Sequence, residues 1–156
     1  MRKYDLIREG KLFRIIALKD FNGVKKGDFG GVVENRNNLG QQGNCWIHEN
    51  AEVRGDAEVS GDALVTGNAS VYGDAKVYGN AEVSGNALVY GNAEVSGDAE
   101  VSADALVTGN ALVYGNAEVT GNAEVYGNAK IYGNARVMGN AKATKEVITF
   151  GEVKGL

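Results

Sequence analysis

The sequence predicts an all-β solenoid, in which short parallel strands stack as successive coils. The first observation is a six-residue repeat, Asn/Asp-Ala-x-Val-x-Gly, which runs from Asn44 to Gly139 without an insertion. The second is that Ala and Val lie two residues apart, so both point to one face of a strand and the x residues point to the other. The third is the Gly-Asn or Gly-Asp corner, where a positive φ is tolerated. A helix is excluded, because each recurring glycine would destabilise it by about 1 kcal/mol.

The repeat resembles the hexapeptide-repeat left-handed parallel β-helix over residues 38–143. In that family three hexapeptides form one triangular coil, an aliphatic residue fills each flat, and a small residue precedes it by two positions. Val and Ala occupy those places here. The resemblance therefore implies a left-handed parallel β-helix with three hexapeptides per coil, and it makes Asn38–Gly43 a worn seventeenth unit.

Both ends depart from the repeat, as the exposed sheet edges of an open solenoid require. We expect a small N-terminal β cap over residues 1–37, the repeat over 38–143, and a C-terminal closing segment over 144–156. The elements expected in these end segments are strands at Tyr4–Arg8 and Leu12–Leu18 around a Glu9-Gly10 turn, a turn at Gly27–Gly31, a strand at Val32–Glu34 and a closing strand at Val147–Phe150.

The N-terminal segment is also similar to that of YdcK-like hexapeptide-repeat proteins, an uncharacterised bacterial group. The similarity lies in Ile15–Lys25, in Gly30-Gly31 and in Gln41–Ile47. Short relatives of this pattern resemble proteins carried by phages and prophages. Members of the group are described as acyltransferases by fold analogy, so the resemblance implies no agreed activity.

Composition narrows the class of protein. The chain contains no proline and one cysteine, Cys45, which falls on an inward position, so no intramolecular disulfide forms. Met1–Phe21 lacks an apolar run long enough for a signal peptide or a membrane span, so we expect a cytoplasmic protein with no membrane partner, located in the host cytoplasm if a phage encodes it. Residues 1–43 hold nine basic and five acidic residues, whereas residues 44–156 hold seven and fifteen. The acidic rod argues against nucleic-acid binding.

Residues for catalysis are scarce. The resemblance to hexapeptide-repeat acyltransferases would imply a trimer that binds CoA and uses a catalytic His beside loops that leave the coil. This chain has one His and no loop within its repeats. His48 is expected on the surface beside an outward Trp46, either as a general base at a subunit seam or as an ordinary surface residue. One His also cannot supply a three-histidine zinc site. We therefore predict no catalytic, cofactor-binding or metal-binding residue.

Two outward columns are candidates for contacts. The first, here the Tyr/Leu face, is apolar and is predicted to mediate self-association, although the same side chains could merely stiffen the coil. The second, here the Glu column, stacks like charges and suits a basic protein partner, or simply solubility. The Tyr/Leu face comprises Tyr72, Leu88, Tyr90, Leu106 and Tyr126, and the Glu column comprises Glu82, Glu100 and Glu118.

These observations predict a non-enzymatic β-solenoid scaffold or protein-binding module that forms homo-oligomers. It would be carried by a phage and would act on a host protein through the acidic face. The alternative is a CoA-dependent, trimeric hexapeptide acyltransferase. A remote alternative is ice binding, for which the column Ser84, Ser102 and Thr120 gives only one of the two rows that a Thr-x-Thr array needs.

Overall fold

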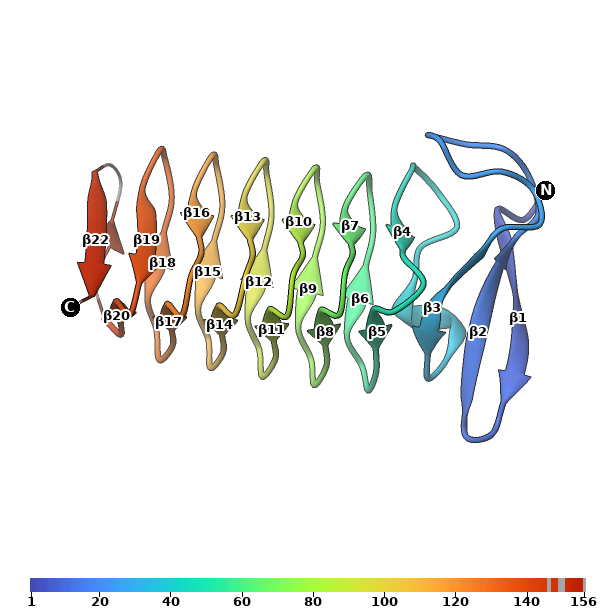
Figure 1. Cartoon of the computed structure of the whole chain (residues 1–156), viewed down its shortest axis with the longest axis horizontal. Helices are drawn as coiled ribbons and strands as arrows, with labels where there is room; N and C mark the ends of the chain where they lie inside the picture. The colour runs from blue at the N-terminus through green and yellow to red at the C-terminus, as the bar shows by residue number, and fades with distance from the viewer. Residues whose placement is uncertain (146, 149–150, 156) are drawn as a thin grey trace.

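The computed structural model describes residues 1–145, 147–148 and 151–155, which form a rod of stacked coils (Figure 1). Over these residues the strands form three sheets of nine, seven and six strands, here sheets 1, 2 and 3. Sheet 1 contains β1 (Tyr4–Glu9), β2 (Leu12–Ala17), β3 (Phe29–Val33), β5 (Glu52–Val53), β8 (Ser70–Val71), β11 (Leu88–Val89), β14 (Leu106–Val107), β17 (Glu124–Val125) and β20 (Lys142–Ala143). Sheet 2 contains β4 (Trp46–Ile47), β7 (Leu64–Val65), β10 (Glu82–Val83), β13 (Glu100–Val101), β16 (Glu118–Val119), β19 (Arg136–Gly139) and β22 (Glu152–Gly155). Sheet 3 contains β6 (Glu58–Val59), β9 (Lys76–Val77), β12 (Glu94–Val95), β15 (Leu112–Val113), β18 (Lys130–Ile131) and β21 (Val147–Ile148).

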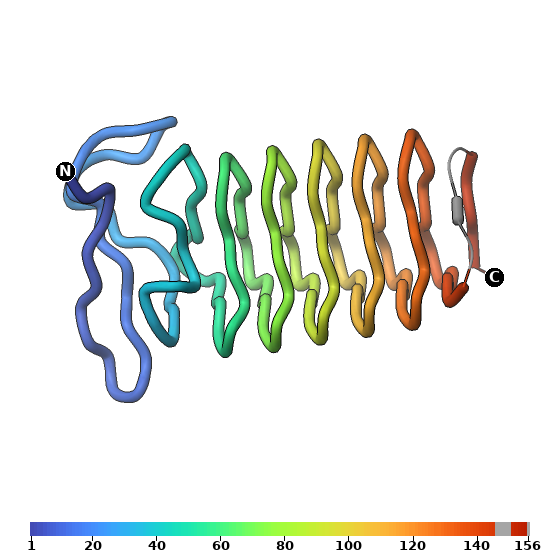
Figure 2. Tube along the Cα trace, turned by 180° about the vertical axis from the view of Figure 1, so that it is seen from behind, coloured from blue at the N-terminus to red at the C-terminus, as the bar shows by residue number. Residues whose placement is uncertain are grey.

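The coils stack in parallel with a constant register, which confirms the predicted β-solenoid. Val83 lies opposite Val101, and Val101 lies opposite Val119, so each coil of three short strands takes eighteen residues. Backbone hydrogen bonds join successive coils; for example, the Glu82 amide donates to the Ala99 carbonyl at 2.9 Å. Figure 2 shows the same regular stack from behind. The amides at the outward positions therefore join one coil to the next, whereas the amide of an inward alanine such as Ala87 donates within its own coil, to the Ser84 carbonyl.

The core is a set of columns of small and branched side chains. The inward Ala and Val residues from Ala51 to Val137 are at most 1% exposed. Nearly every corner is closed by a glycine with positive φ, whereas Glu49 takes the glycine place in the first unit without a positive φ. Gly97 has φ +68°, and a Cβ added there would lie 2.9 Å from the Gly115 backbone nitrogen. Ala103 occupies one of these corners at φ +57°, which is a strained conformation for a residue with a side chain.

The N-terminal hairpin extends sheet 1 beyond the coils. β1 and β2 pair in antiparallel register from Tyr4–Ala17 to Glu9–Leu12, with Gly10 at φ +66° in the turn, as the sequence predicted. β3 pairs with β2 on one side and with β5 of the first coil on the other. The predicted turn at Gly27–Gly31 is wrong in its second half, because β3 already begins at Phe29 and the Gly30-Gly31 backbone packs closely against the first coil.

The predicted seventeenth unit has a different register from the repeat. Leu39, expected at an Ala position, forms a parallel bridge with Val59 and so takes the place of a Val. Asn38, expected at an exposed corner, is fully buried at the end of a 3₁₀ turn, η1 (Arg36–Asn38). Gln41 and Gln42 then lengthen the corner before Gly43, which rejoins the coil geometry beside Gly61. The prediction was wrong because it placed this segment by its Asn and Gly, whereas burial of Leu39 sets the register.

The C-terminal segment continues the solenoid instead of closing it with one strand. β21 pairs with β18 in sheet 3, and β22 pairs with β19 in sheet 2, both in parallel. The expected closing strand at Val147–Phe150 therefore holds only for Val147–Ile148, and Thr149 and Phe150 lie outside the described residues.

Candidate interaction faces and the cap cleft

The Tyr/Leu face lies on the outer side of sheet 1. Tyr72 and Leu88 are each 37% exposed, and the rings of Tyr72 and Tyr90 stack with their centroids 4.8 Å apart. Leu88 is the register partner of Ser70 on one side and Leu106 on the other. Tyr126 belongs to the same column but is separated from Tyr90 by Thr108. The structure therefore groups Tyr72, Leu88, Tyr90 and Leu106 as one patch, with Tyr126 beyond its edge.

A hollow interrupts this face where the column contains its smallest outward side chain. Ser70 lies between Glu52 and Leu88 in the ladder, and its short side chain lines an open depression with a volume of about 400 Å³. Tyr72 and Leu88 supply apolar walls, and the ion pair between Arg54 and Glu52 lies at its edge. The sequence analysis missed this hollow, although the alternation of Ser70 with larger neighbours every eighteen residues was a usable signal.

The outer face of the hairpin and β3 continues the same sheet face and mixes apolar with charged side chains; its apolar members are here the cap patch. Phe29 and Ile7 are the most exposed of them, at 55% and 43%, while Arg14 lies in register between Ile7 and Val32 and Asp5 lies beside Ile16. Ile16 pairs with Phe29 across the strands, and Val32 pairs with Glu52 of the first coil. Composition of the segment alone could not reveal this patch, because the order of strand pairing decides which face these residues share. The cap patch comprises Ile7, Ile16, Phe29 and Val32.

The three glutamates of the Glu column lie in register, but they are not equivalent. Glu82 pairs with Glu100 and Glu100 with Glu118 along sheet 2. The guanidinium of Arg136 donates two hydrogen bonds to the Glu118 carboxylate, at 2.8 and 3.3 Å, and these bonds raise the pKa of Arg136. Among the described residues Glu82 and Glu100 form no ion pair. The unneutralised part of the column is therefore Glu82 and Glu100 alone.

His48 lines a cleft between the cap and the first coil, and the cleft has a volume of about 560 Å³. Trp46, expected to be exposed beside it, is only 2% exposed, because the cap loop folds over its outward side and Phe21 packs edge-on against the indole at 5.3 Å. His48 itself is exposed, and Asp28 and Glu49 lie on the same cleft. Within the described residues no cluster of three His, Cys, Asp or Glu side chains could hold a metal.

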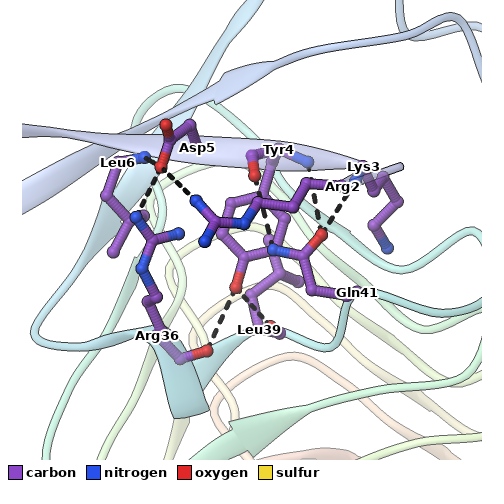
Figure 3. A network of polar contacts seen from close by, with 8 residues as sticks. All are labelled: Arg2, Lys3, Tyr4, Asp5, Leu6, Arg36, Leu39 and Gln41. Atoms are coloured by element: carbon purple, nitrogen blue, oxygen red, sulfur yellow. Dashed lines mark hydrogen bonds and ion pairs between the residues drawn. The ribbon is translucent and has the colours of Figure 1, made fainter.

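Polar side chains seal the N-terminal end of the coils (Figure 3). The Tyr4 hydroxyl donates to the carbonyls of Leu39 at 2.5 Å and Arg36 at 3.0 Å. Burial raises the pKa of Tyr4 to about 12, so the hydroxyl keeps the proton that it donates. The ammonium of Lys3, which is 1% exposed, donates to the Cys45 carbonyl at 2.8 Å and contacts the Cys45 sulfur at 3.1 Å. These contacts satisfy backbone oxygens that an open first coil would leave without partners.

The fold and the repeat together define a hexapeptide-repeat β-solenoid. A family model described as the YdcK β-solenoid repeat matches residues 129–141. A protein of Escherichia coli (strain K12), described as the uncharacterized acetyltransferase YdcK, is 38% identical in a region that covers 31% of this chain and 19% of the relative. The predicted similarity to YdcK-like hexapeptide-repeat proteins is thus confirmed, while this chain spans about a fifth of that relative. In the part of the chain that is described, no helix is long and apolar enough to cross a membrane.

Proposed function

We propose that the chain is a non-enzymatic β-solenoid module that self-associates through the Tyr/Leu face and presents its acidic sides to a protein partner. The observation that supports this most is the apolar outer face of sheet 1, where Tyr72 and Leu88 are each 37% exposed and lie close together. Tyr78 on sheet 3 is 38% exposed, but its hydroxyl donates a hydrogen bond to Glu94. Exposed apolar patches bordered by polar residues are typical of protein contacts.

Self-association is tested by light scattering on the parent chain and on the variant Leu88→Lys with Leu106→Lys. Two ammonium groups at the centre of the patch would have to be desolvated on contact, so we expect the oligomer mass to fall to that of the monomer. The control is Ser60→Lys with Ser96→Lys, which adds the same two charges on the outer side of sheet 3, where Tyr78 lies between them in the column. A parent chain that stays monomeric at high concentration would contradict the proposal.

A basic partner would meet the rod where its acidic charge is not neutralised. Glu82 and Glu100 provide that charge on sheet 2, and a field of one sign attracts basic surfaces in a salt-dependent way. Capture of partners by the tagged chain, followed by a salt titration, tests this. If the affinity for the captured partner changes neither with salt nor in the double variant Glu82→Gln with Glu100→Gln, these residues serve solubility only. The interpretation as a phage-borne module directed at a host protein stays a prediction.

Acetyl transfer is the second candidate, and the printed description of the E. coli relative favours it. The cleft that contains His48 is the place where an imidazole could act as a general base, with Asp28 and Glu49 nearby. Titration calorimetry with CoA tests the idea directly. Saturable micromolar binding that is lost in His48→Ala would support acetyl transfer and contradict the non-enzymatic proposal.

A further inference from the structure

We propose that Asn22 is a modification site, at which deamidation yields aspartate or isoaspartate, and that the isoaspartate form releases the cap loop from Trp46. The cap loop joins β2 to β3 over residues 18–28 and reaches from the hairpin toward the coil that contains β4 (Figure 1). Its tip is an exposed turn formed by Asn22 and Gly23, and this is the one Asn-Gly pair in the sequence.

The reaction needs only water and groups that the turn itself contains. The backbone nitrogen of Gly23 attacks the side-chain carbonyl carbon of Asn22 and forms a C–N bond there, and the side-chain nitrogen leaves as ammonia with the proton of the Gly23 amide. Water then opens the cyclic imide at either carbonyl carbon. Opening at the backbone carbonyl carbon gives isoaspartate, in which the main chain runs through the former side chain and is longer by a methylene group. No oxidant or reductant takes part.

The turn leaves the attacking nitrogen free. Gly23 has φ +83°, nothing lies within 4 Å of a Cβ built there, and within the described residues its amide donates no hydrogen bond. Asn22 has φ +38°, a left-handed conformation that is less favourable for an L residue than the extended one, so opening of the turn relieves strain. Local opening has to break the hydrogen bonds between the backbones of Phe21 and Val24, at 2.9 and 2.7 Å.

An asparagine at a corner of the coils is better protected, as Asn80 shows. The next residue is Ala81, whose amide donates to the Tyr78 carbonyl at 3.4 Å, so the nitrogen that would attack is engaged. The Asn80 side chain donates to the Asp98 carboxylate at 2.9 Å, which holds it against the next coil. The Ala81 side chain also crowds its own amide, whereas glycine has none. The cap turn is therefore where the chain should deamidate first.

A longer main chain at this tip affects Trp46 directly. Phe21, the residue before the turn, packs edge-on against the Trp46 indole at 5.3 Å, and the turn residues line the cleft beside it. An added methylene group disrupts the pairing of Phe21 with Val24, so the Phe21 ring moves off the indole. The base of the loop keeps its own contacts, since the Asp20 carboxylate accepts from the Lys26 amide at 2.8 Å. The coils therefore stay folded while the tip is released.

Ageing of the purified chain in warm, mildly alkaline buffer tests the site. Peptide mapping by mass spectrometry should find deamidation at Asn22 at least about tenfold faster than at Asn80, because Asn22 precedes a glycine whose amide is free. A synthetic peptide of residues 19–26 gives the rate of the same sequence without the fold. If Asn22 is unchanged in the chain after the peptide has converted, the turn protects the residue and the proposal is overturned.

Acrylamide quenching of fluorescence tests the release of the loop, because Trp46 is the single tryptophan and is 2% exposed. Ageing of the parent should raise the quenching constant at least about twofold, in step with the isoaspartate content. Asn22→Gly keeps a sequence that suits the turn and should show no rise on ageing. Fresh Asn22→Asp adds the carboxylate without lengthening the main chain, so its indole should stay protected. Quenching that stays low while isoaspartate accumulates, or that is already high in fresh Asn22→Asp, would overturn release by isoaspartate.

Discussion

The coils and the cap are stabilised by different kinds of contact. In the coils, stability is spread over equivalent units, in which fully buried Ala and Val columns are joined by hydrogen bonds at an eighteen-residue spacing. In the cap and in the 3₁₀ turn that joins it to the first coil, a few buried polar groups that occur once each make several contacts, as Lys3 and Asn38 do. Both regions bury their backbone groups, but the repeat achieves this by stacking and the cap by side chains that reach distant carbonyls. Substitution of matched residues in the two regions should separate these mechanisms.

The largest effect should follow from a charge placed inside a coil. Val101 is fully buried between Val83 and Val119, so Val101→Asp would bury a carboxylate without a partner, at a cost of several kcal/mol that approaches the whole stability of a domain. We expect the variant to be insoluble or to lose its β-sheet circular dichroism. Ser102→Asp, which adds the same group at the next, outward position, should remain folded. A soluble, cooperatively folded Val101→Asp protein would show that the inward assignment is wrong.

The next largest loss of stability should come from replacing a buried asparagine beside the cap, and it can be compared with the loss of an exposed asparagine in a coil. The amide of buried Asn38 donates to the carbonyls of Gly55 and Ala57 at 2.9 and 2.8 Å, and its oxygen accepts from the Glu34 and Asn35 amides at 3.0 and 2.8 Å. Asn38→Ala leaves the Asn35 amide and the Ala57 carbonyl without their partner, whereas the Glu34 amide still donates to Val53 and the Gly55 carbonyl still accepts from the Asn35 side chain. The substitution should therefore cost roughly 2 kcal/mol in the free energy of unfolding.

The matched coil substitution is Asn92→Ala. Asn92 is exposed and donates one hydrogen bond to Asn110 at 3.1 Å, so its loss should cost less than about 0.5 kcal/mol. Urea denaturation of both variants at one temperature gives the comparison. Equal losses of stability would mean that the cap is held no more tightly by its polar contacts than the coils are by theirs.

The same contrast explains how much the sequence could predict. The columns of Val and Ala were predictable, because a constant period fixes both the face and the coil of each residue. The Tyr/Leu face and the Glu column were placed on the correct sides for the same reason. Lys3 could not be assigned its role, because its partners lie about forty positions away in the chain and no period connects them. Trp46 was misplaced in a similar way, since the cap loop that covers it has no counterpart in the other coils.

Substitutions at the corners of the coils should have effects of the same size or smaller. Gly97→Ala requires a left-handed conformation for Ala and a Cβ about 2.9 Å from the Gly115 nitrogen, so it should cost roughly 2 kcal/mol. Ala103 already has this strain at φ +57°, and Ala103→Gly should stabilise the chain by roughly 0.5 kcal/mol after the greater flexibility of the unfolded glycine is subtracted. Thermal unfolding of the two variants measures whether each substitution lowers or raises the stability of the chain. Destabilisation by Ala103→Gly would show that the alanine side chain contributes packing that outweighs its backbone strain.

The smallest effect distinguishes members of the Glu column. Glu100 lies between Glu82 and Glu118 in register and has no cationic partner among the described residues, so Glu100→Gln removes repulsion and should stabilise the chain by roughly 0.3 kcal/mol at low salt. Glu118→Gln should have the opposite sign, because it removes the carboxylate that accepts two hydrogen bonds from Arg136. Both effects should shrink as salt rises, since salt screens exposed charges. Melting temperatures of the two variants at low and high salt provide the measurement. If Glu118→Gln stabilises the chain as much as Glu100→Gln does, Arg136 does not neutralise the end of the column, and all three glutamates are then equally available to a basic partner.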